Sequence, residues 1–159
     1  MTLLRVLTVC ALMVPSFALA QGLQVAFAGF NQDGDLPIEI AADSMAIDQV
    51  DGSALLTGNV VIGQGELRLA APRVTVNYAD TGGISRIFAE GGVTFVTPEE
   101  EAESRTALYE LSDDSIFLSG DVLLIQGSNA VSSDTMRVDL ASGTALLEGR
   151  VRTVLQSNE

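Results

Sequence analysis

The polar stretch Asn31-Gln32-Asp33-Gly34-Asp35 is the part of the chain that most resembles a metal-binding loop. Its first, third and fifth positions carry the oxygen-bearing side chains with which a calcium loop begins. The sixth position is Leu36, where such a loop needs glycine, and the twelfth is Ala42, where it needs a bidentate glutamate. We therefore interpret the stretch as a linker, and we predict neither a metal site nor a cofactor for this chain.

Residues suited to acid–base or nucleophilic catalysis are scarce. The chain has no histidine, and its single cysteine, Cys10, lies within the first 20 residues. It also contains no Gly-x-Ser-x-Gly elbow and no phosphate-binding glycine loop. The sequence does not exclude a catalytic pair of carboxylates, because two acidic residues that are distant in sequence can lie close together in a fold. We predict that the protein is not an enzyme, and we interpret the acidic cluster Glu99, Glu100, Glu101 and Glu103 as a solvated loop that guards a strand edge.

The first 20 residues have the pattern of a secretory signal peptide. Arg5 is followed by an apolar run from Val6 to Phe17 and by Ala18-Leu19-Ala20, a small-x-small cleavage pattern. Cleavage near Ala20 would leave residues 21–35 as a flexible mature N-terminus. The alternative is a membrane anchor over residues 6–30, because this stretch has no charged residue and is long enough to span a bilayer.

The mature chain is strongly acidic. Eight basic residues less Arg5 leave seven, all arginine, against 21 acidic residues, a formal charge of −14. A chain of this charge would be repelled by a phosphate backbone, so we predict no nucleic-acid partner. Without cysteine after cleavage, the exported protein would hold together without disulfides.

Alternation of apolar and polar residues is the dominant pattern in residues 36–155. Examples are Ile38-Glu39-Ile40, Val74-Thr75-Val76 and Met136-Arg137-Val138. A period of two residues is typical of half-buried β-strands, and no stretch sustains the helical period of 3.6. We therefore predict one all-β domain over residues 36–155, followed by a tail at residues 156–159.

A glycine recurs at a regular interval within this alternation. It stands at Gly58, Gly91, Gly120 and Gly149, at spacings of 33, 29 and 29 residues, with valine two positions later each time. The residue between them differs in every copy: Asn59, Gly92, Asp121 and Arg150. This variation excludes a shared catalytic role for that side chain. An isolated glycine in a strand pattern marks a bulge or a sharp bend, so the spacing predicts four bends in register.

A second phrase repeats in step, upstream of the glycine. Met45, Ala107 and Met136 each stand 13 residues before it, and in the remaining unit four residues are inserted around Asp80-Thr81-Gly82-Gly83. Each unit then reads as strand, turn, strand, glycine bend and strand. A unit of this size cannot bury its apolar face alone, so the sequence predicts four stacked strand-turn-strand repeats.

Two of these phrases together carry a resemblance to a known family. The run from Pro37 to Ser44, Pro-Ile-Glu-Ile-Ala-Ala-Asp-Ser, followed by Leu56-Thr57-Gly58-Asn59-Val60, resembles the LptA or OstA-like periplasmic lipopolysaccharide-transport proteins. The resemblance covers about residues 36–155. It implies an open, twisted antiparallel β jelly-roll, a folded-over sheet with an apolar groove.

The resemblance also implies a function, a location and partners. Such a protein works in the periplasm and shields the acyl chains of lipopolysaccharide in its groove on the way from the inner to the outer membrane. It joins end to end, by β pairing, with an inner-membrane LptC-like protein and an outer-membrane LptD-like protein, and it can form a homo-oligomer. The seven arginines offer few cations to the phosphates of the head group.

Alternation places a set of apolar residues on the inner face of the expected groove. The residues that we expect to contact acyl chains are Ile38, Ile40, Leu56, Val60, Ile62, Phe95, Val122 and Leu124. Ile38 and Ile40 match the first-strand motif with which the family lines its groove. Met45, Ile47, Val74, Val76, Leu118, Met136, Val138 and Leu147 complete the predicted interior.

Two other interpretations remain open from the sequence. The same residues would fill a dry core if the repeats built a ligand-free, self-associating β scaffold. A chain that kept residues 6–30 as a helix would instead be the inner-membrane-anchored, LptC-like partner of the same fold.

Overall fold

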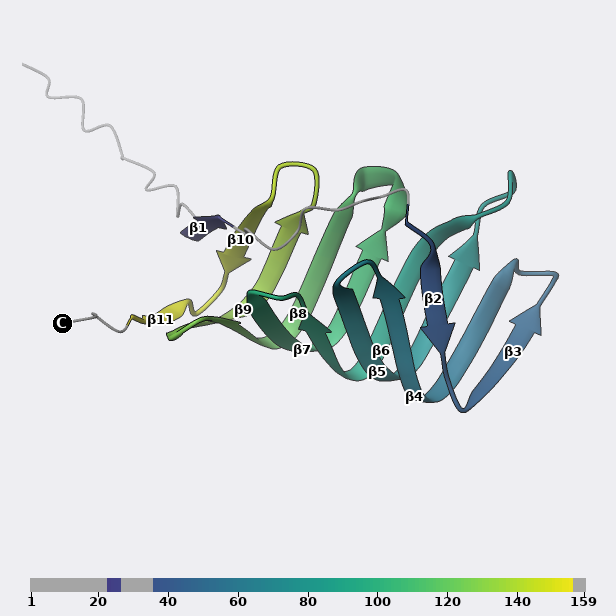
Figure 1. Ribbon diagram of the computed structural model, residues 1–159, viewed down its shortest axis with the longest axis horizontal. Coiled ribbons are helices and arrows are strands. Elements are labelled where there is room, and N and C mark those ends of the chain that lie inside the picture. The colour runs from purple at the N-terminus through teal and green to yellow at the C-terminus, as the bar shows by residue number, and fades with distance from the viewer. Residues whose placement is uncertain (1–22, 27–35, 156–159) are drawn as a thin grey trace, which may run out of the picture.

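The computed structural model of the protein describes residues 23–26 and 36–155 (Figure 1). These residues form eleven β-strands and one short 3₁₀ turn, η1 (Leu111–Asp113), with no α-helix among them. The strands are β1 (Leu23–Ala26), β2 (Ile38–Ala41), β3 (Ser44–Asp48), β4 (Ser53–Gln64), β5 (Leu67–Tyr78), β6 (Ile84–Val96), β7 (Glu100–Glu110), β8 (Ser115–Gln126), β9 (Asn129–Asp139), β10 (Thr144–Glu148) and β11 (Arg152–Val154).

All eleven strands belong to one antiparallel sheet. The path runs β1-β10-β9-β8-β7-β6-β5-β4-β2, with β3 also paired to β4 and β11 also paired to β9. From β3 to β10 each strand lies beside its neighbour in sequence, as short turns dictate. The two ends of the sheet do not pair with each other, so the sheet stays open. The all-β, open antiparallel prediction is confirmed.

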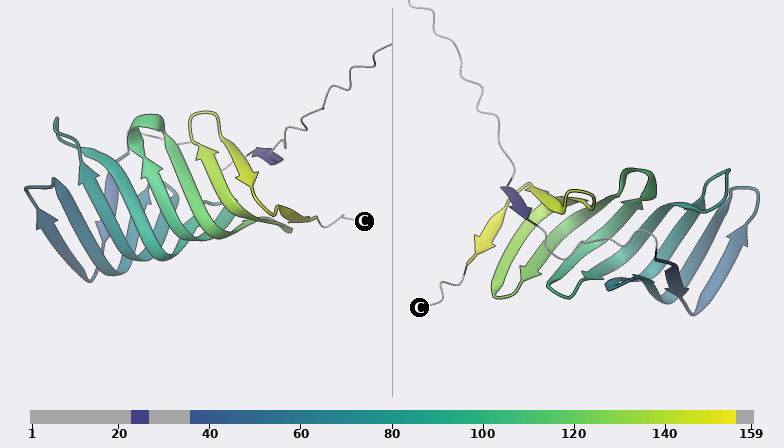
Figure 2. Two further views of the ribbon diagram at one scale, coloured as in Figure 1. Left: turned by 180° about the vertical axis from the view of Figure 1, so that it is seen from behind. Right: turned by 45° about the horizontal axis from the view of Figure 1, so that its top comes forward.

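The long strands bend near their middle, so that the sheet folds over into two facing walls (Figure 2). The first wall contains β3 and β10 with residues 53–57, 73–78, 84–90, 106–110, 115–119 and 135–139, and β1 lies along its end. The second wall contains β2 and β11 with residues 60–64, 67–71, 93–96, 100–104, 122–126 and 129–133. The bend closes one side of the space between the walls, and the hairpin turns lie along its open mouth.

The bends occur at the repeated glycines. Thr57 pairs with Arg73 and Val60 with Ala71, so that Gly58 and Asn59 together stand opposite the single residue Pro72. Such a two-against-one bulge turns the strand sharply. The register shifts in the same way between Glu90 and Val93 and between Ser119 and Val122. The predicted glycine bends are therefore confirmed.

Both residues of each bulge have positive φ, which the glycine spacing alone does not predict. The second positions are Asn59 (φ 44°), Gly92 (φ 99°), Asp121 (φ 49°) and Arg150 (φ 45°). Asparagine and aspartate tolerate this left-handed region better than most residues, whereas arginine does not prefer it. The bend geometry therefore overrides the local preference at Arg150.

The core lies between the walls. The largest fully buried side chains are Leu56, Ile116, Leu118, Leu124, Met136, Leu147, Val60, Val74, Val76, Val122 and Val138. They alternate along each strand with residues that face outward, as a pleated strand requires. The valine two positions after each of the first three glycines is buried, so the bend is followed by an inward residue, as predicted.

Two predictions from the sequence differ from the structure. Met45 and Ile47 face the interior side but are 52% and 67% exposed, because β3 is an edge strand with no neighbour on its far side. Glu100, Glu101 and Glu103 lie in β7, a central strand, instead of a solvated loop. The two-residue alternation around Ala102 continues through these glutamates, and this period favours a strand in spite of their charge.

The N-terminal segment contains an unexpected strand. β1 pairs with β10, so Leu23–Ala26 adds a strand at the far end of the sheet. The expected signal peptide, the rest of the expected flexible segment at residues 27–35, and the tail at residues 156–159 lie outside the described residues.

Candidate functional site

The inner face of the folded sheet is the most extensive apolar surface of the described chain. Six of the eight residues assigned to the groove point into it and are almost fully covered: Leu56, Val60, Ile62, Phe95, Val122 and Leu124 are between 0% and 4% exposed. They come from both walls and from three strands, β4, β6 and β8. The structure thus places them on one face, as alternation predicts; contact with lipid remains a prediction.

Ile38 and Ile40 differ from these six because they are only half-buried. Both lie on β2, whose only partner among the described strands is β4, and Ile40 stands opposite Ile62. They pack against the core from its edge. Edge position and partial burial make these two residues the accessible part of the predicted groove.

A small apolar cavity of about 20 Å³ lies between the walls. The second wall contributes predicted residues Ile38, Ile62 and Phe95, and the first wall closes the cavity with Ile87, Tyr109 and Ile116. Sequence analysis did not assign Ile87, Tyr109 or Ile116 to the groove. The alternation of inward and outward residues could have placed these three side chains on the inner face. It does not show which residues of the two walls meet.

One carboxylate stands on the inner face near the mouth. Glu100 is 5% exposed, and its Oε1 accepts a hydrogen bond from Gln126 Nε2 at 2.7 Å. Its backbone closes the turn at Thr97: the Thr97 amide donates to the Glu100 carbonyl at 2.9 Å. This buried carboxylate, together with the buried Thr97, Ser104 and Ser133, interrupts a mainly apolar face and marks the polar limit of the groove.

Polar links between neighbouring strands run along the bend. Asn59 Nδ2 donates to Asp43 Oδ2 at 2.8 Å, and Arg150 Nε donates to Asp134 Oδ1 at 2.8 Å. Arg105 pairs with Asp121 in the same way. Hydrogen bonding to Arg150 lowers the pKa of Asp134, and the same bond raises the pKa of Arg150. These links join three of the four bulges to the neighbouring chain segment, and the bulge at Gly91 and Gly92 has no polar side chain to form one.

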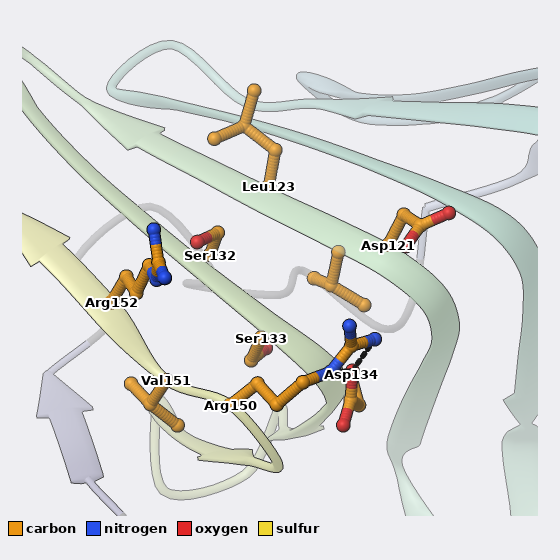
Figure 3. A pocket seen from close by; sticks show the side chains of 9 residues that line it. Asp121, Leu123, Ser132, Ser133, Asp134, Arg150, Val151 and Arg152 are labelled. Carbon is orange, nitrogen blue, oxygen red and sulfur yellow. Dashed lines mark hydrogen bonds and ion pairs between the residues drawn. The ribbon is translucent and has the colours of Figure 1, made fainter.

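An open depression of about 500 Å³ lies beside the link between Arg150 and Asp134 (Figure 3). Its rim carries Asp121, Asp134, Arg150 and Arg152, and Leu123 and Ser132 lie on β8 and β9 between them. In Figure 3 Arg150 reaches over to Asp134, so that this arginine is already neutralised by a carboxylate. The mixed charges give the depression no net preference for an anion.

The two ends of the sheet differ. At one end β3 has a free edge on the first wall, and β2 has a free edge on the second wall. At the other end β1 covers the edge of β10, whereas β11 has no further neighbour. Exposed strand edges are templates for pairing with another chain.

The described residues, 23–26 and 36–155, contain neither a cluster of metal-ligating side chains nor a helix that could cross a membrane. No group of three or more histidine, cysteine, aspartate or glutamate residues in these ranges has metal-binding geometry. The same ranges contain no helix long and apolar enough to cross a membrane.

Comparisons with known proteins agree with the fold. The family model described as LptA/(LptD N-terminal domain) LPS transport protein matches residues 39–144. An uncharacterized protein of Rhizobium meliloti (strain 1021) is 31% identical over 157 residues, which cover 91% of this chain and 84% of that protein. The crystal structure of LptH, the LptA-homologous periplasmic component of the lipopolysaccharide transport device of Pseudomonas aeruginosa, has the same fold, with a TM-score of 0.72. That similarity has 22% identity and covers 79% of this chain and 99% of LptH.

The family model covers more than half of the chain, and its matched region contains three of the four bends and most of the inner face. The members of this family are transport proteins, not enzymes. The chain therefore belongs to the LptA and LptD N-terminal domain family of lipopolysaccharide transport proteins.

Proposed function

We propose that the protein is a periplasmic carrier that shields the acyl chains of lipopolysaccharide between its two walls during transport from the inner to the outer membrane. The observation that carries the proposal is an unclosed sheet whose two walls both present apolar residues to the space between them. Family membership supplies the substrate class.

The energetics favour recognition of the lipid tails. Burial contributes about 0.8 kcal/mol per methylene, so several long acyl chains outweigh surface charge effects of about 1 kcal/mol or less each. A chain with a net charge of −13 can therefore hold an anionic lipid through its tails. The depression at the bend offers no net positive charge to a phosphate, because Asp121 and Asp134 balance Arg150 and Arg152.

Binding requires the walls to move apart. The cavity of about 20 Å³ is much smaller than the pockets of roughly 300–1,000 Å³ that hold drug-sized ligands. β2 is a weakly held part of this closure, because it has four residue pairs with β4 and no other partner among the described strands. Acyl chains would enter beside Ile38 and Ile40 and then separate the walls near Phe95.

The open strand edges support partners at both ends. The β3 and β2 edges at one end, and the β11 edge at the other, can each accept an added strand through backbone hydrogen bonds. We assign these edges to an inner-membrane LptC-like protein, an outer-membrane LptD-like protein and further copies of the chain.

Photo-crosslinking tests the groove. A benzophenone amino acid at Ile38, Ile40 or Phe95 should form lipopolysaccharide adducts in exported protein. Glu39 is the matched control, because it lies between the two isoleucines but faces outward, opposite Gly63. Adducts at Phe95, which is 2% exposed, would show that the walls part. Absence of adducts at all three inner positions, or equal labelling at Glu39, contradicts the proposal.

Two alternatives have specific observations in their favour. The nearly filled interior suits a ligand-free β scaffold, and lipid extraction followed by mass spectrometry separates it from a carrier. The charge-free stretch from Val6 to Gln32 suits a membrane-anchored, LptC-like protein. N-terminal sequencing of the exported protein decides that point, since a start at Gln21 excludes the anchor.

A further inference from the structure

The two ends of the first wall differ in how exposed the apolar residues on their inner side are. At the β3 end, Met45 and Ile47 face the inner side and are 52% and 67% exposed. At the β10 end, Ala145 and Leu147 are 1% and 0% exposed. The difference between the ends is β1, which lies along β10 and pairs with four of its five residues.

The register of β1 follows the internal repeat. In the first and last repeats, two apolar residues of the first wall stand opposite a leucine and an alanine of the next strand: Met45 and Ile47 face Leu56 and Ala54, and Met136 and Val138 face Leu147 and Ala145. On the outer edge of β10, Leu23 and Val25 stand opposite Leu147 and Ala145. β1 therefore occupies the position that the next repeat would fill.

A second copy of the chain could supply that next repeat through its β3. Strands alternate in direction across the sheet, and β1 is antiparallel to β10. An incoming β3 in the same direction would place Met45 opposite Leu147 and Ile47 opposite Ala145, which repeats the pattern of the other strands. Its alternation of apolar residues, Met45-Ala46-Ile47, matches Leu23-Gln24-Val25 in β1.

We propose that β1 is a removable cap, a mimic of β3 that occupies the β10 edge until β3 of a second copy displaces it. This inference rests on the end-to-end pairing in the proposed function, and it adds a way in which that pairing is regulated. Expected cleavage near Ala20 leaves β1 in the mature chain.

The second wall provides the starting point for displacement. β1 covers only the first wall, whereas the β11 edge beside it has no further neighbour, and Val154 is 64% exposed. An incoming copy pairs its β2 with β11 and its five-residue β3 with β10, so it forms contacts on both walls. The four residue pairs of β1 are replaced by a longer, two-wall junction.

Self-association of the mature full chain tests the cap. The double variant Gln24→Pro/Val25→Pro removes two consecutive N–H donors, one of which must point toward β10, so it releases the cap. Sedimentation equilibrium should show association about tenfold tighter than wild type, because the competent edge is no longer occupied. Gln24→Ala/Val25→Ala, which keeps both N–H groups, is the matched control and should show a smaller increase.

A second pair of changes identifies the incoming strand. Met45→Glu/Ile47→Glu alters exposed residues, so the monomer should fold with an unchanged circular dichroism spectrum. Added to the proline variant, it should return association to the wild-type value or below.

The outcomes separate the cap from the end-to-end pairing. Unchanged association of the proline variant, with weaker association of the glutamate variant, overturns the cap and keeps the pairing. Tighter association that the glutamates do not reverse overturns β3 as the incoming strand. No response to either change overturns both, while the crosslinking at Ile38 and Ile40 still reports separately on lipid binding.

Discussion

At the residue scale, the bends depend on the absence of a side chain. Gly58 has a φ of 77°, and a β-carbon added there would overlap the carboxylate of Asp43, which lies between β2 and β3. A β-carbon at Gly91 would lie 2.7 Å from Pro72 Cγ. The positive φ and the close approach of a neighbouring side chain therefore both require glycine at these bends. This requirement explains why glycine recurs at a regular interval.

Replacement of Gly58 by alanine should lower the free energy of unfolding by about 1 to 3 kcal/mol, because of the positive φ and the overlap with Asp43. Gly63→Ala on the same strand is the matched control. Its φ is not in the left-handed region, and its nearest neighbour is the flexible end of Arg68, so the loss should stay below about 1 kcal/mol. Urea unfolding measures both, and equal losses would contradict the bend argument.

The link between Asp134 and Arg150 should make stability depend on pH. Because Arg150 lowers the folded-state pKa of Asp134, the stabilisation is complete above the ordinary value of 3.8 and is lost as the pH falls through the lowered pKa. The stability difference between wild type and Asp134→Asn should therefore be larger at pH 7 than at pH 3. Arg150→Ala is the control background, in which the same substitution should lose most of this pH dependence. A difference that grows on acidification would contradict the assignment.

At the element scale, position in the sheet decides what each repeat contributes. Met45 and Met136 are equivalent in the repeat, each 13 residues before its glycine. Met136 lies on β9 between two strands and is 0% exposed, whereas Met45 lies on the edge strand β3. The same residue type is thus core in one repeat and surface in another.

This difference predicts unequal effects of the same substitution. Met136→Ala should destabilise the protein by about 2 to 5 kcal/mol, because it opens a cavity in a packed core. Met45→Ala should stay within about 0.5 kcal/mol, as for an exposed residue. Thermal unfolding at low protein concentration compares the two, and a large loss at Met45 would indicate that its edge is already covered.

At the scale of the whole molecule, charge and apolar burial act in opposite directions on an anionic lipid. The chain carries a net charge of −13, and four of the arginines in the described residues, Arg73, Arg86, Arg105 and Arg150, are paired with carboxylates. Binding by the tails should therefore proceed against a weak overall repulsion.

Added salt should tighten lipopolysaccharide binding severalfold between about 0.05 and about 0.5 M, because it screens this repulsion and strengthens apolar burial. Deacylated lipopolysaccharide is the matched control ligand and should not bind at either salt concentration. Fluorescence titration below the aggregation threshold of the lipid would measure both. Weaker binding at high salt would instead indicate a phosphate site built from arginine.

Local patterns in the sequence determined the strands, the inward face and the bends of this protein. A period of two residues places Leu56, Val74 and Met136 on the inner face whatever surrounds them, and glycine at a fixed spacing marks where the strands turn. Six of the eight predicted groove residues accordingly lie on the inner face and are buried.

Only the tertiary structure decided which inward residues are covered and what meets across the walls. Met45 and Ile47 are exposed because no strand follows β3, and Glu100 is buried because β7 lies in the middle of the sheet. The pairing of β1 with β10 joins positions more than a hundred residues apart. Alternation assigns a face to each side chain, but burial depends on neighbours that are distant in sequence, and these exist only once the sheet has formed.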